Sequence, residues 1–274
     1  MQTNLTDIYY RNVTLKNIYY FMLAPTLTYQ MAYPRMIRKT IRWTRVFTLI
    51  LRLFFCSVIT VLLIGQVVTP QLERLIEDLD RYNEPYIFSP HIFGEYLLKL
   101  ALANTYIWLL GFYSLFHLWL NLWAELLRFG DCVFYRDWWN SSEVSSYWRL
   151  WNLPVHYWLV RHLYFPCIRC GFSKTMAMFA VFFFSAVMHE VLISIPFHMV
   201  RPWAFWGMMG QVPLVMITKY FEKLFPGSSI GNITFWISFC LVGQPMAVLM
   251  YTIDYWKQQN DVAQTNPTFS SSEL

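Results

Sequence analysis

The stretch TMAMFAVFFFSAVMHE, residues 175–190, decides the fold class of this chain. From Thr175 to His189 no residue carries a formal charge. As a helix rising about 1.5 Å per residue, this run would place His189 roughly 22 Å beyond Lys174. An apolar run of this length predicts a membrane-spanning helix. The ionisable pair at its end, His189 and Glu190, is a candidate for a functional site inside the bilayer.

Composition extends this prediction to the whole chain. Of the 274 residues, 57% are hydrophobic and only 14% are charged, whereas soluble domains carry about 25% charged residues. Backbone groups in lipid must be hydrogen-bonded internally, which favours helices. We therefore expect an all-α, multi-spanning transmembrane helical bundle, with spans near residues 46–68, 99–124, 175–197, 203–218 and 233–253.

The distribution of charge predicts the orientation of these spans. Five basic residues without an acidic residue among them precede the first span, namely Arg35, Arg38, Lys39, Arg42 and Arg45. The positive-inside rule places that end in the cytosol, and alternation of spans then makes segment 125–174 cytosolic. The net charge of +5 is interpreted as this orientation signal, and no nucleic-acid-binding motif is present, so no nucleic-acid partner is expected. Residues 1–256 are predicted to form one membrane domain and residues 257–274 a disordered polar tail.

The segment FYRDWWN, residues 134–140, gathers amphipathic aromatic and polar side chains. Such a string suits the headgroup level of a membrane, where Trp and Tyr keep one end dry and one end wet. Taken alone, an interfacial anchor and a substrate-contacting motif explain it equally well. The residues that we assign to this motif are Phe134, Tyr135, Asp137, Trp138, Trp139 and Asn140.

Polar residues in two further segments are candidates for chemistry. Trp148, Asn152 and His156 recur at intervals of four, which would place them on one stripe of a helix that Pro154 bends or ends. Burial would keep the His189 ring neutral, the form that a general base needs, although a packing histidine is the alternative. Ser185 precedes His189 by one helical turn.

Three motifs in combination resemble the sterol and diacylglycerol acyltransferase branch of the membrane-bound O-acyltransferases. They are FYRDWWN (134–140), the Trp151, Asn152 and His156 set, and SAVMHE (185–190). The likeness is closer to the diacylglycerol enzymes, through YYFMLAPTLTYQ (19–30), ELLRFGD (125–131), WNLPVHYW (151–158), RHLYFP (161–166), WAFWGMM (203–209) and GQPMAVLMY (243–251). It covers about residues 9–256 and corresponds to the C-terminal portion of such enzymes, so we expect the chain to lack N-terminal spans of the family bundle.

The resemblance implies a helical bundle in the endoplasmic reticulum membrane, with a chamber open to the cytosol and to the bilayer. It implies acyl transfer from acyl-CoA to diacylglycerol, with no cofactor beyond the acyl-CoA substrate and no metal. The implied partners are these substrates, membrane lipids and further copies of the chain in a dimer or tetramer.

The resemblance also implies roles for single residues. His189 and Asn152 would be catalytic, and the implied substrate-binding residues are Ser185, Glu190, His156, Gln211, Gln244, Lys174 and Trp151. Two positions depart from the pattern. Met178 stands where some relatives have a basic residue, and Arg149 stands where some have Gln. Arg161 and Arg169 are candidates to replace the missing charge.

Two other functions stay open from the sequence. A sterol or a long-chain alcohol would demand the same base and thioester site. Alternatively, the chain is an inactive relative that acts as a partner. If spans are missing, the 274-residue chain alone should have little acyltransferase activity, because reacting groups displaced by about 1 Å can lose 100-fold in rate.

Overall fold

The computed structural model describes residues 13–30, 32–38, 40–82 and 90–265. Within these ranges all regular secondary structure is helical. The β-type pairing there is limited to one isolated bridge between Arg35 and Phe129. The predicted all-α fold class is confirmed.

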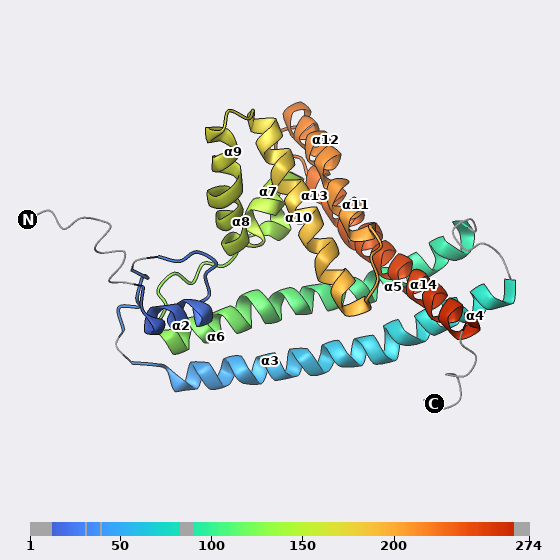
Figure 1. The fold of residues 1–274 in the computed structure, drawn as a ribbon, viewed down its shortest axis with the longest axis horizontal. Helices are drawn as coiled ribbons and strands as arrows, with labels where there is room; N and C mark the ends of the chain where they lie inside the picture. The colour runs from blue at the N-terminus through green and yellow to red at the C-terminus, as the bar shows by residue number, and fades with distance from the viewer. Residues whose placement is uncertain (1–12, 31, 39, 83–89, 266–274) are drawn as a thin grey trace, which may run out of the picture.

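Two long helices form the base of the molecule and run side by side (Figure 1). The first joins α3 (Trp43–Leu63), η1 (Ile64–Val68) and α4 (Thr69–Tyr82) without a break. The second joins α5 (Pro90–Phe112), η3 (Tyr113–Trp119) and α6 (Leu120–Leu127). The short helix α2 (Leu15–Leu23) packs on α6. The η1 and η3 segments are π-helical turns, which add a residue per turn and change the facing direction of the side chains that follow.

A lobe of shorter helices stands on this base (Figure 1). Its elements are η4 (Trp138–Asn140), α7 (Val144–Leu150), α8 (Leu153–Leu159), η5 (Val160–Tyr164), α9 (Phe165–Arg169), α10 (Lys174–Phe197), α11 (Trp203–Met209) and α12 (Gln211–Leu224). A last long helix, made of α13 (Ile230–Phe235), η6 (Trp236–Gly243) and α14 (Gln244–Thr265), descends from the lobe and packs along α5.

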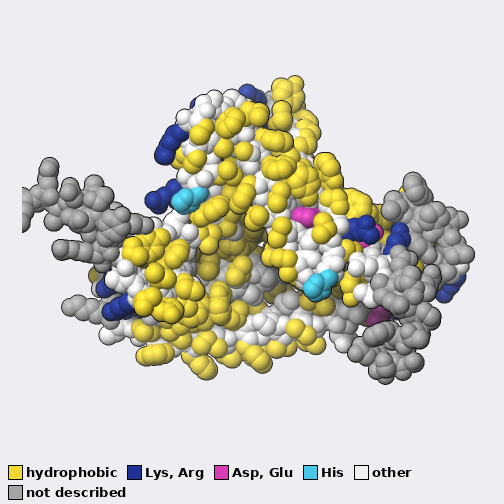
Figure 2. Space-filling view, in the orientation of Figure 1, with side chains coloured by type: hydrophobic (Ala, Val, Ile, Leu, Met, Phe, Trp, Pro, Cys, Tyr) yellow, Lys and Arg dark blue, Asp and Glu magenta, His cyan; other side chains and the backbone are white. Residues whose placement is uncertain are grey.

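Four helices in the described part of the chain are long and apolar enough to cross a membrane: Trp43–Leu79, Pro90–Leu127, Lys174–Phe197 and Ile230–Asn260. The predicted spans 46–68, 99–124, 175–197 and 233–253 fall inside them. Hydrophobic side chains cover most of the visible face, while Lys and Arg side chains gather toward its edges (Figure 2).

The fifth predicted span, 203–218, is not one continuous helix. It is divided at Gly210 into α11, with 7 residues, and α12, with 14 residues. A span needs about 20 apolar residues, and α12 soon reaches the charged residues Lys219, Glu222 and Lys223. The predicted polar tail also differs, because α14 continues as helix to Thr265, and residues 266–274 lie outside the described residues.

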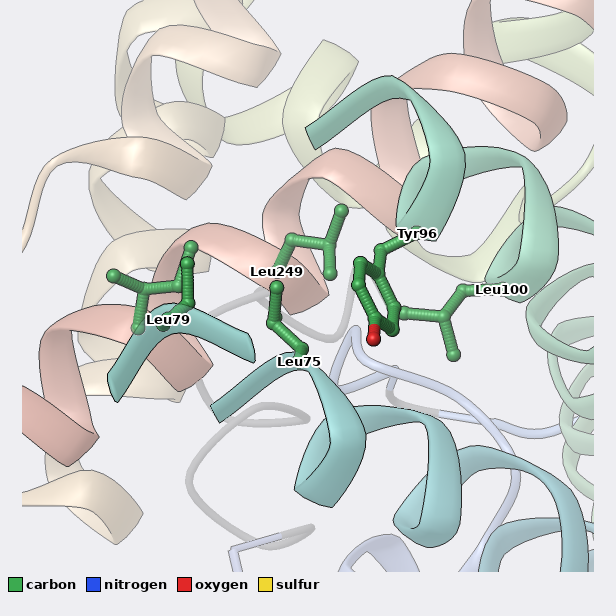
Figure 3. Packing of buried hydrophobic residues seen from close by; sticks show 6 residues of the cluster. Leu75, Leu79, Tyr96, Leu100 and Leu249 are labelled. Atoms are coloured by element: carbon green, nitrogen blue, oxygen red, sulfur yellow. The ribbon is translucent and has the colours of Figure 1, made fainter. Parts of the chain in front are cut away.

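The two base helices are tied together at both ends. At one end Leu75, Leu79, Tyr96 and Leu100 pack with Leu249 of α14 (Figure 3), and the Tyr96 hydroxyl donates to Asp78 Oδ2 at 2.6 Å. At the other end the carboxylate of Glu125 in α6, only 1% exposed, receives hydrogen bonds from Arg42 at 2.8 and 3.2 Å. Arg38 and Arg45 also lie within 4.0 Å of this carboxylate. The arginines that predicted orientation therefore also anchor α3.

Candidate functional site

A cavity of about 620 Å³ lies inside the lobe, between α7, α8, η5, α10, α11 and α12. Five of the residues predicted to be catalytic or substrate-binding line it: His189, Asn152, Ser185, His156 and Trp151. They come from two segments about 30 residues apart in the sequence. The lining is otherwise mostly apolar, which suits a long hydrocarbon substrate with a few orienting polar groups.

The cavity has a charged end and an end that holds His189. Along α10 it extends from Met178 to His189, roughly 16 Å of helix. The α11–α12 segment returns antiparallel to α10 (Figure 1), so Lys219 lies toward the start of α10. Glu143 is on the same level, because the next residue's N–H bonds to Thr218 at 3.3 Å, and Arg149 lies 4.0 Å from the Glu143 carboxylate. Lys219, Glu143 and Arg149 therefore mark the charged end.

The hydrogen bond of His189 selects the tautomer of its neutral ring. Nδ1 lies 2.7 Å from the backbone carbonyl oxygen of Ser185 and 3.4 Å from the Ser185 hydroxyl. A carbonyl oxygen can only accept, so Nδ1 carries the proton in the neutral ring. Nε2 then holds the lone pair and is the nitrogen able to take a proton from a substrate.

Asn152 lies at the junction of α7 and α8 rather than in the middle of one helix. Its backbone is non-helical, with φ −143° and ψ 84°, and its Oδ1 caps α8 by accepting the Val155 N–H at 3.1 Å. Pro154 sits in the first turn of α8, where its lack of an N–H costs nothing. The expected stripe of Trp148, Asn152 and His156 thus comes from two helices, yet all three side chains line the cavity. The cap leaves the Asn152 Nδ2 group as a donor for a ligand.

His156 lies one turn into α8 and lines the same cavity. Burial lowers the pKa of its imidazole below the ordinary value, and the positive charge of Arg149 lowers it further. A neutral ring can donate from one nitrogen and accept at the other. His156 can therefore orient a polar group without adding charge to the cavity.

Four residues predicted to bind substrate lie outside the cavity lining. Glu190 is turned away from His189 because adjacent residues of a helix point about 100° apart, and its carboxylate accepts from Ser194 Oγ, the Phe205 N–H and the Tyr251 hydroxyl at 3.0, 3.2 and 2.8 Å. Gln244 pairs with Asn104 of α5 at 3.4 Å. Gln211 opens α12, and Lys174 is exposed at the start of α10.

The FYRDWWN segment is a packing unit at the foot of the lobe. Phe134 and Trp138 are 3% and 2% exposed, and Trp138 makes edge-on ring contacts with Tyr147 and Phe235. The Tyr135 hydroxyl lies 2.8 Å from Nδ1 of His117 in η3, which joins the lobe to the base. Asp137, Trp139 and Asn140 are exposed, and none of the segment lines the cavity.

Sequence reasoning missed Lys219 as a cavity residue. Its signal was weak: it lies one turn after the buried Val215 on α12, the spacing that brings two side chains to one face. Arg149 and Met178, the two departures from the family pattern, both line the cavity, whereas Arg161 and Arg169 do not. The described residues contain no group of three His, Cys, Asp or Glu placed to hold a metal ion.

The long apolar helices define a membrane-embedded protein, and its helical lobe encloses the cavity that His189 lines. Residues 13–253 match the model of the membrane-bound O-acyltransferase family, and the chain belongs to this family.

Three curated relatives share most of this chain. It is 45% identical over 250 residues to diacylglycerol O-acyltransferase 1C of Glycine max, covering 91% of this chain and 47% of the relative. It is 46% identical over 254 residues to diacylglycerol O-acyltransferase 1 of Corylus americana, covering 93% and 46%. With diacylglycerol O-acyltransferase 1 of Arabidopsis thaliana it shares 45% over 254 residues, covering 92% and 46%. The chain therefore spans about half the length of these relatives.

Proposed function

We propose that this chain carries the acid–base site of an enzyme that transfers a fatty acyl group from acyl-CoA to the free hydroxyl of diacylglycerol. The products are triacylglycerol and CoA. The observation that carries the proposal is the Nδ1–H bond of His189 to the Ser185 carbonyl at 2.7 Å, inside the cavity. The names of the relatives support the acyl acceptor.

In the proposed reaction, His189 Nε2 accepts the proton of the diacylglycerol hydroxyl as that oxygen attacks the thioester carbonyl carbon. The C–S bond then breaks, and the CoA sulfur takes the proton from the imidazolium. General base catalysis of this kind is worth about 10²- to 10⁴-fold in rate. The proton that His189 gains is the one that it returns, so the ring ends in its starting form.

Asn152 is the proposed donor to the thioester oxygen, where negative charge develops during attack. Its Oδ1 is occupied by the Val155 N–H, so its Nδ2 is the end that can face a ligand. A well-placed donor to such an oxygen is worth about 3 kcal/mol. Gln244, the other amide considered for this role, bonds Asn104 of α5 and is a weaker candidate.

The charged end of the cavity is the proposed site for the CoA phosphates. Lys219 and Arg149 supply two positive charges there, and Glu143 holds the Arg149 side chain in place. The pantetheine arm of CoA would then run about 16 Å along α10 and bring the thioester to His189. Lys174, exposed at the start of α10, is proposed as an outer phosphate contact.

The proposed location is the endoplasmic reticulum membrane, with segment 125–174 in the cytosol and with the assembled protein a dimer or tetramer. Cys170 is an exposed free thiol in this segment and is the probe of choice. Cys132 is a poorer probe because burial raises the pKa of its thiol. A membrane-impermeant maleimide should label Cys170 in sealed microsomes. Labelling only after the microsomes are permeabilised would place segment 125–174 in the lumen.

The catalytic proposal is tested in microsomes from cells that lack their own triacylglycerol synthesis. Variants His189→Ala and His91→Ala, each joined behind the N-terminal spans of a relative, are compared for labelled triacylglycerol formed from labelled acyl-CoA. We expect His189→Ala to lose at least about 100-fold, and His91→Ala, at an exposed site on α5, to match the parent. Equal activity of a folded His189→Ala variant would remove the base assignment. Greater ester formation with cholesterol or a long-chain alcohol would mean that this alcohol, rather than diacylglycerol, is the acyl acceptor.

A further inference from the structure

A second, smaller cavity of about 230 Å³ lies on the other side of α8. Three segments form it: the loop after α2, the loop around residues 129–134, and one face of α8 and η5. Pro154, Tyr157 and Arg161 line it from the helix, while Val155, His156 and Leu159 line the His189 cavity. One helix thus separates the two cavities.

The walls of this second cavity are held by backbone hydrogen bonds between distant segments. The Gly130 N–H donates to the Pro34 carbonyl at 2.8 Å, and the Met36 N–H donates to the Arg128 carbonyl at 2.9 Å. The Leu153 N–H donates to the Phe134 carbonyl at 3.0 Å, which fixes the start of α8. A side chain at position 130 would lie 3.0 Å from the Arg35 carbonyl carbon. The cavity is therefore preformed rather than a gap between loose loops.

The lining carries one charge of each sign. Arg161 extends from η5 and Asp131 from the facing loop, with the hydroxyls of Thr26 and Thr28 and the Gln30 amide around them. In the described part of the chain no ion pair joins Arg161 to Asp131. Two opposite charges that line one cavity without pairing suit a ligand that carries both an anionic and a cationic group.

The position of the cavity indicates a lipid headgroup. The helix α2 leads directly into the lining and exposes Leu15, Tyr19 and Met22 by 74%, 64% and 70%. These residues share one face, while Tyr20 turns the other way and donates to the Leu127 carbonyl at 3.4 Å. A short helix with one exposed apolar face suits the membrane interface, at the depth of the headgroups. Pro25, Thr26 and Thr28, which line the cavity, follow α2 directly and would lie in the same layer.

We propose that this cavity binds the headgroup of a phospholipid with a primary amine, such as phosphatidylethanolamine. The phosphate would accept from the Arg161 guanidinium, and the ammonium group would donate to the Asp131 carboxylate. The hydroxyls of Thr26 and Thr28 complete the site. A choline headgroup fits less well because its quaternary nitrogen has no N–H to donate to Asp131. This site is independent of acyl transfer at His189.

Binding is measured by thermal unfolding of the purified full chain in detergent, titrated with phosphatidylethanolamine. A ligand that binds only the folded state raises Tm in proportion to its occupancy. We expect half-maximal stabilisation of Arg161→Gln and Asp131→Asn to need roughly 10- to 100-fold more lipid, since each loses a charge-assisted hydrogen bond. Arg161→Lys should lose less, because it keeps the charge. Arg169→Gln and Glu77→Gln, exposed and outside the cavity, should behave like the parent.

Four outcomes would overturn the proposal. Equal titrations for Arg161→Gln and Arg169→Gln would show that the lipid binds elsewhere. Equal stabilisation by phosphatidylcholine would remove the ammonium contact with Asp131. Stabilisation by free CoA that is lost in Arg161→Gln would assign the cavity to the nucleotide. Soluble phosphoethanolamine tests whether the headgroup alone is enough for binding. We expect it to leave Tm unchanged at concentrations where the lipid saturates. An equal rise in Tm would mean that the cavity binds a soluble ligand rather than a lipid.

Discussion

The first base helix and the lobe differ in how far the protein buries their apolar side chains. Of the most apolar stretch in Trp43–Leu79, only 6% is buried within the protein, and Phe47, Phe54 and Phe55 are more than half exposed. In the lobe Trp138 and Tyr147 are at most 2% exposed and pack ring against ring with each other and with the equally buried Phe235 of α13. Most apolar side chains of α3 have no burying partner among the described residues, whereas the lobe supplies its own partners. Substitutions should therefore be tolerated along α3 and costly in the lobe.

Glycine-to-alanine changes give the largest expected contrast. A Cβ at Gly231, where α13 crosses the segment before α7, would overlap the Ser142 carbonyl oxygen, and the Asn232 amide binds the Trp139 and Ser141 carbonyls at the same junction. We expect Gly231→Ala to lower the free energy of unfolding by about 3 kcal/mol. Gly111→Ala, in α5 with no neighbour within 4 Å, should be neutral or gain up to about 1 kcal/mol. Equal unfolding midpoints in denaturant would contradict the contrast.

The buried carboxylate of Glu125 is one of the contacts that tie α3 to the protein. Glu125→Gln removes the charge that Arg42 binds with two side-chain hydrogen bonds. Because Arg42 is 40% exposed and can be hydrated, we expect a loss of about 2 kcal/mol rather than the larger cost of a fully buried pair. Glu95→Gln, which breaks an exposed pair with Lys99, should cost under about 1 kcal/mol. A Glu125 effect no larger than that of Glu95 in the same thermal assay would mean that the Arg42–Glu125 pair does not anchor α3.

Tyr251 tests whether the network behind His189 positions the lobe. Its hydroxyl contacts Glu190 Oε2 at 2.8 Å, accepts the Ala204 N–H at 2.9 Å and lies 2.9 Å from the Arg201 carbonyl. Tyr251→Phe should cost about 1–2 kcal/mol of stability and lower kcat with little change in the KM for acyl-CoA, because α10 and α11 lose their common anchor. Tyr255→Phe on the same helix, 41% exposed, is the control. Unchanged kcat in a stable Tyr251→Phe variant would restrict the network to folding.

The smallest effect concerns His156 at low pH. Because burial and Arg149 lower the folded-state pKa of His156, the unfolded state binds the proton more readily. Stability is therefore full above the ordinary histidine pKa of about 6.5 and falls as pH drops toward the folded-state value. His156→Gln should flatten the dependence of Tm on pH between about 7 and 5, and Arg149→Gln should reduce it. A steeper dependence of Tm on pH in either variant would contradict the lowered folded-state pKa of His156.

Much of the site was predictable because it follows from local patterns. The uncharged run before His189 and the one-turn spacing to Ser185 required only helix geometry, and both residues line the cavity. Asn152, His156 and Trp151 were also predicted from a short segment. Glu190 and Gln244 were placed outside the lining because the rotation of a helix about its axis depends on its neighbours. Lys219 was missed because a lone charged residue after an apolar run does not show which helix it will face.

By itself the sequence determined the membrane environment, the all-α class and the position of His189 along its helix, since these depend on hydropathy and on the fixed rise of a helix. The tertiary structure decided which polar groups meet. It divided 203–218 at Gly210, ended α7 so that Asn152 caps α8, and turned Glu190 toward Tyr251. These outcomes depend on contacts between helices distant in the sequence, and in lipid such contacts are selected by close packing and hydrogen bonds rather than by the hydrophobic pattern of any one helix.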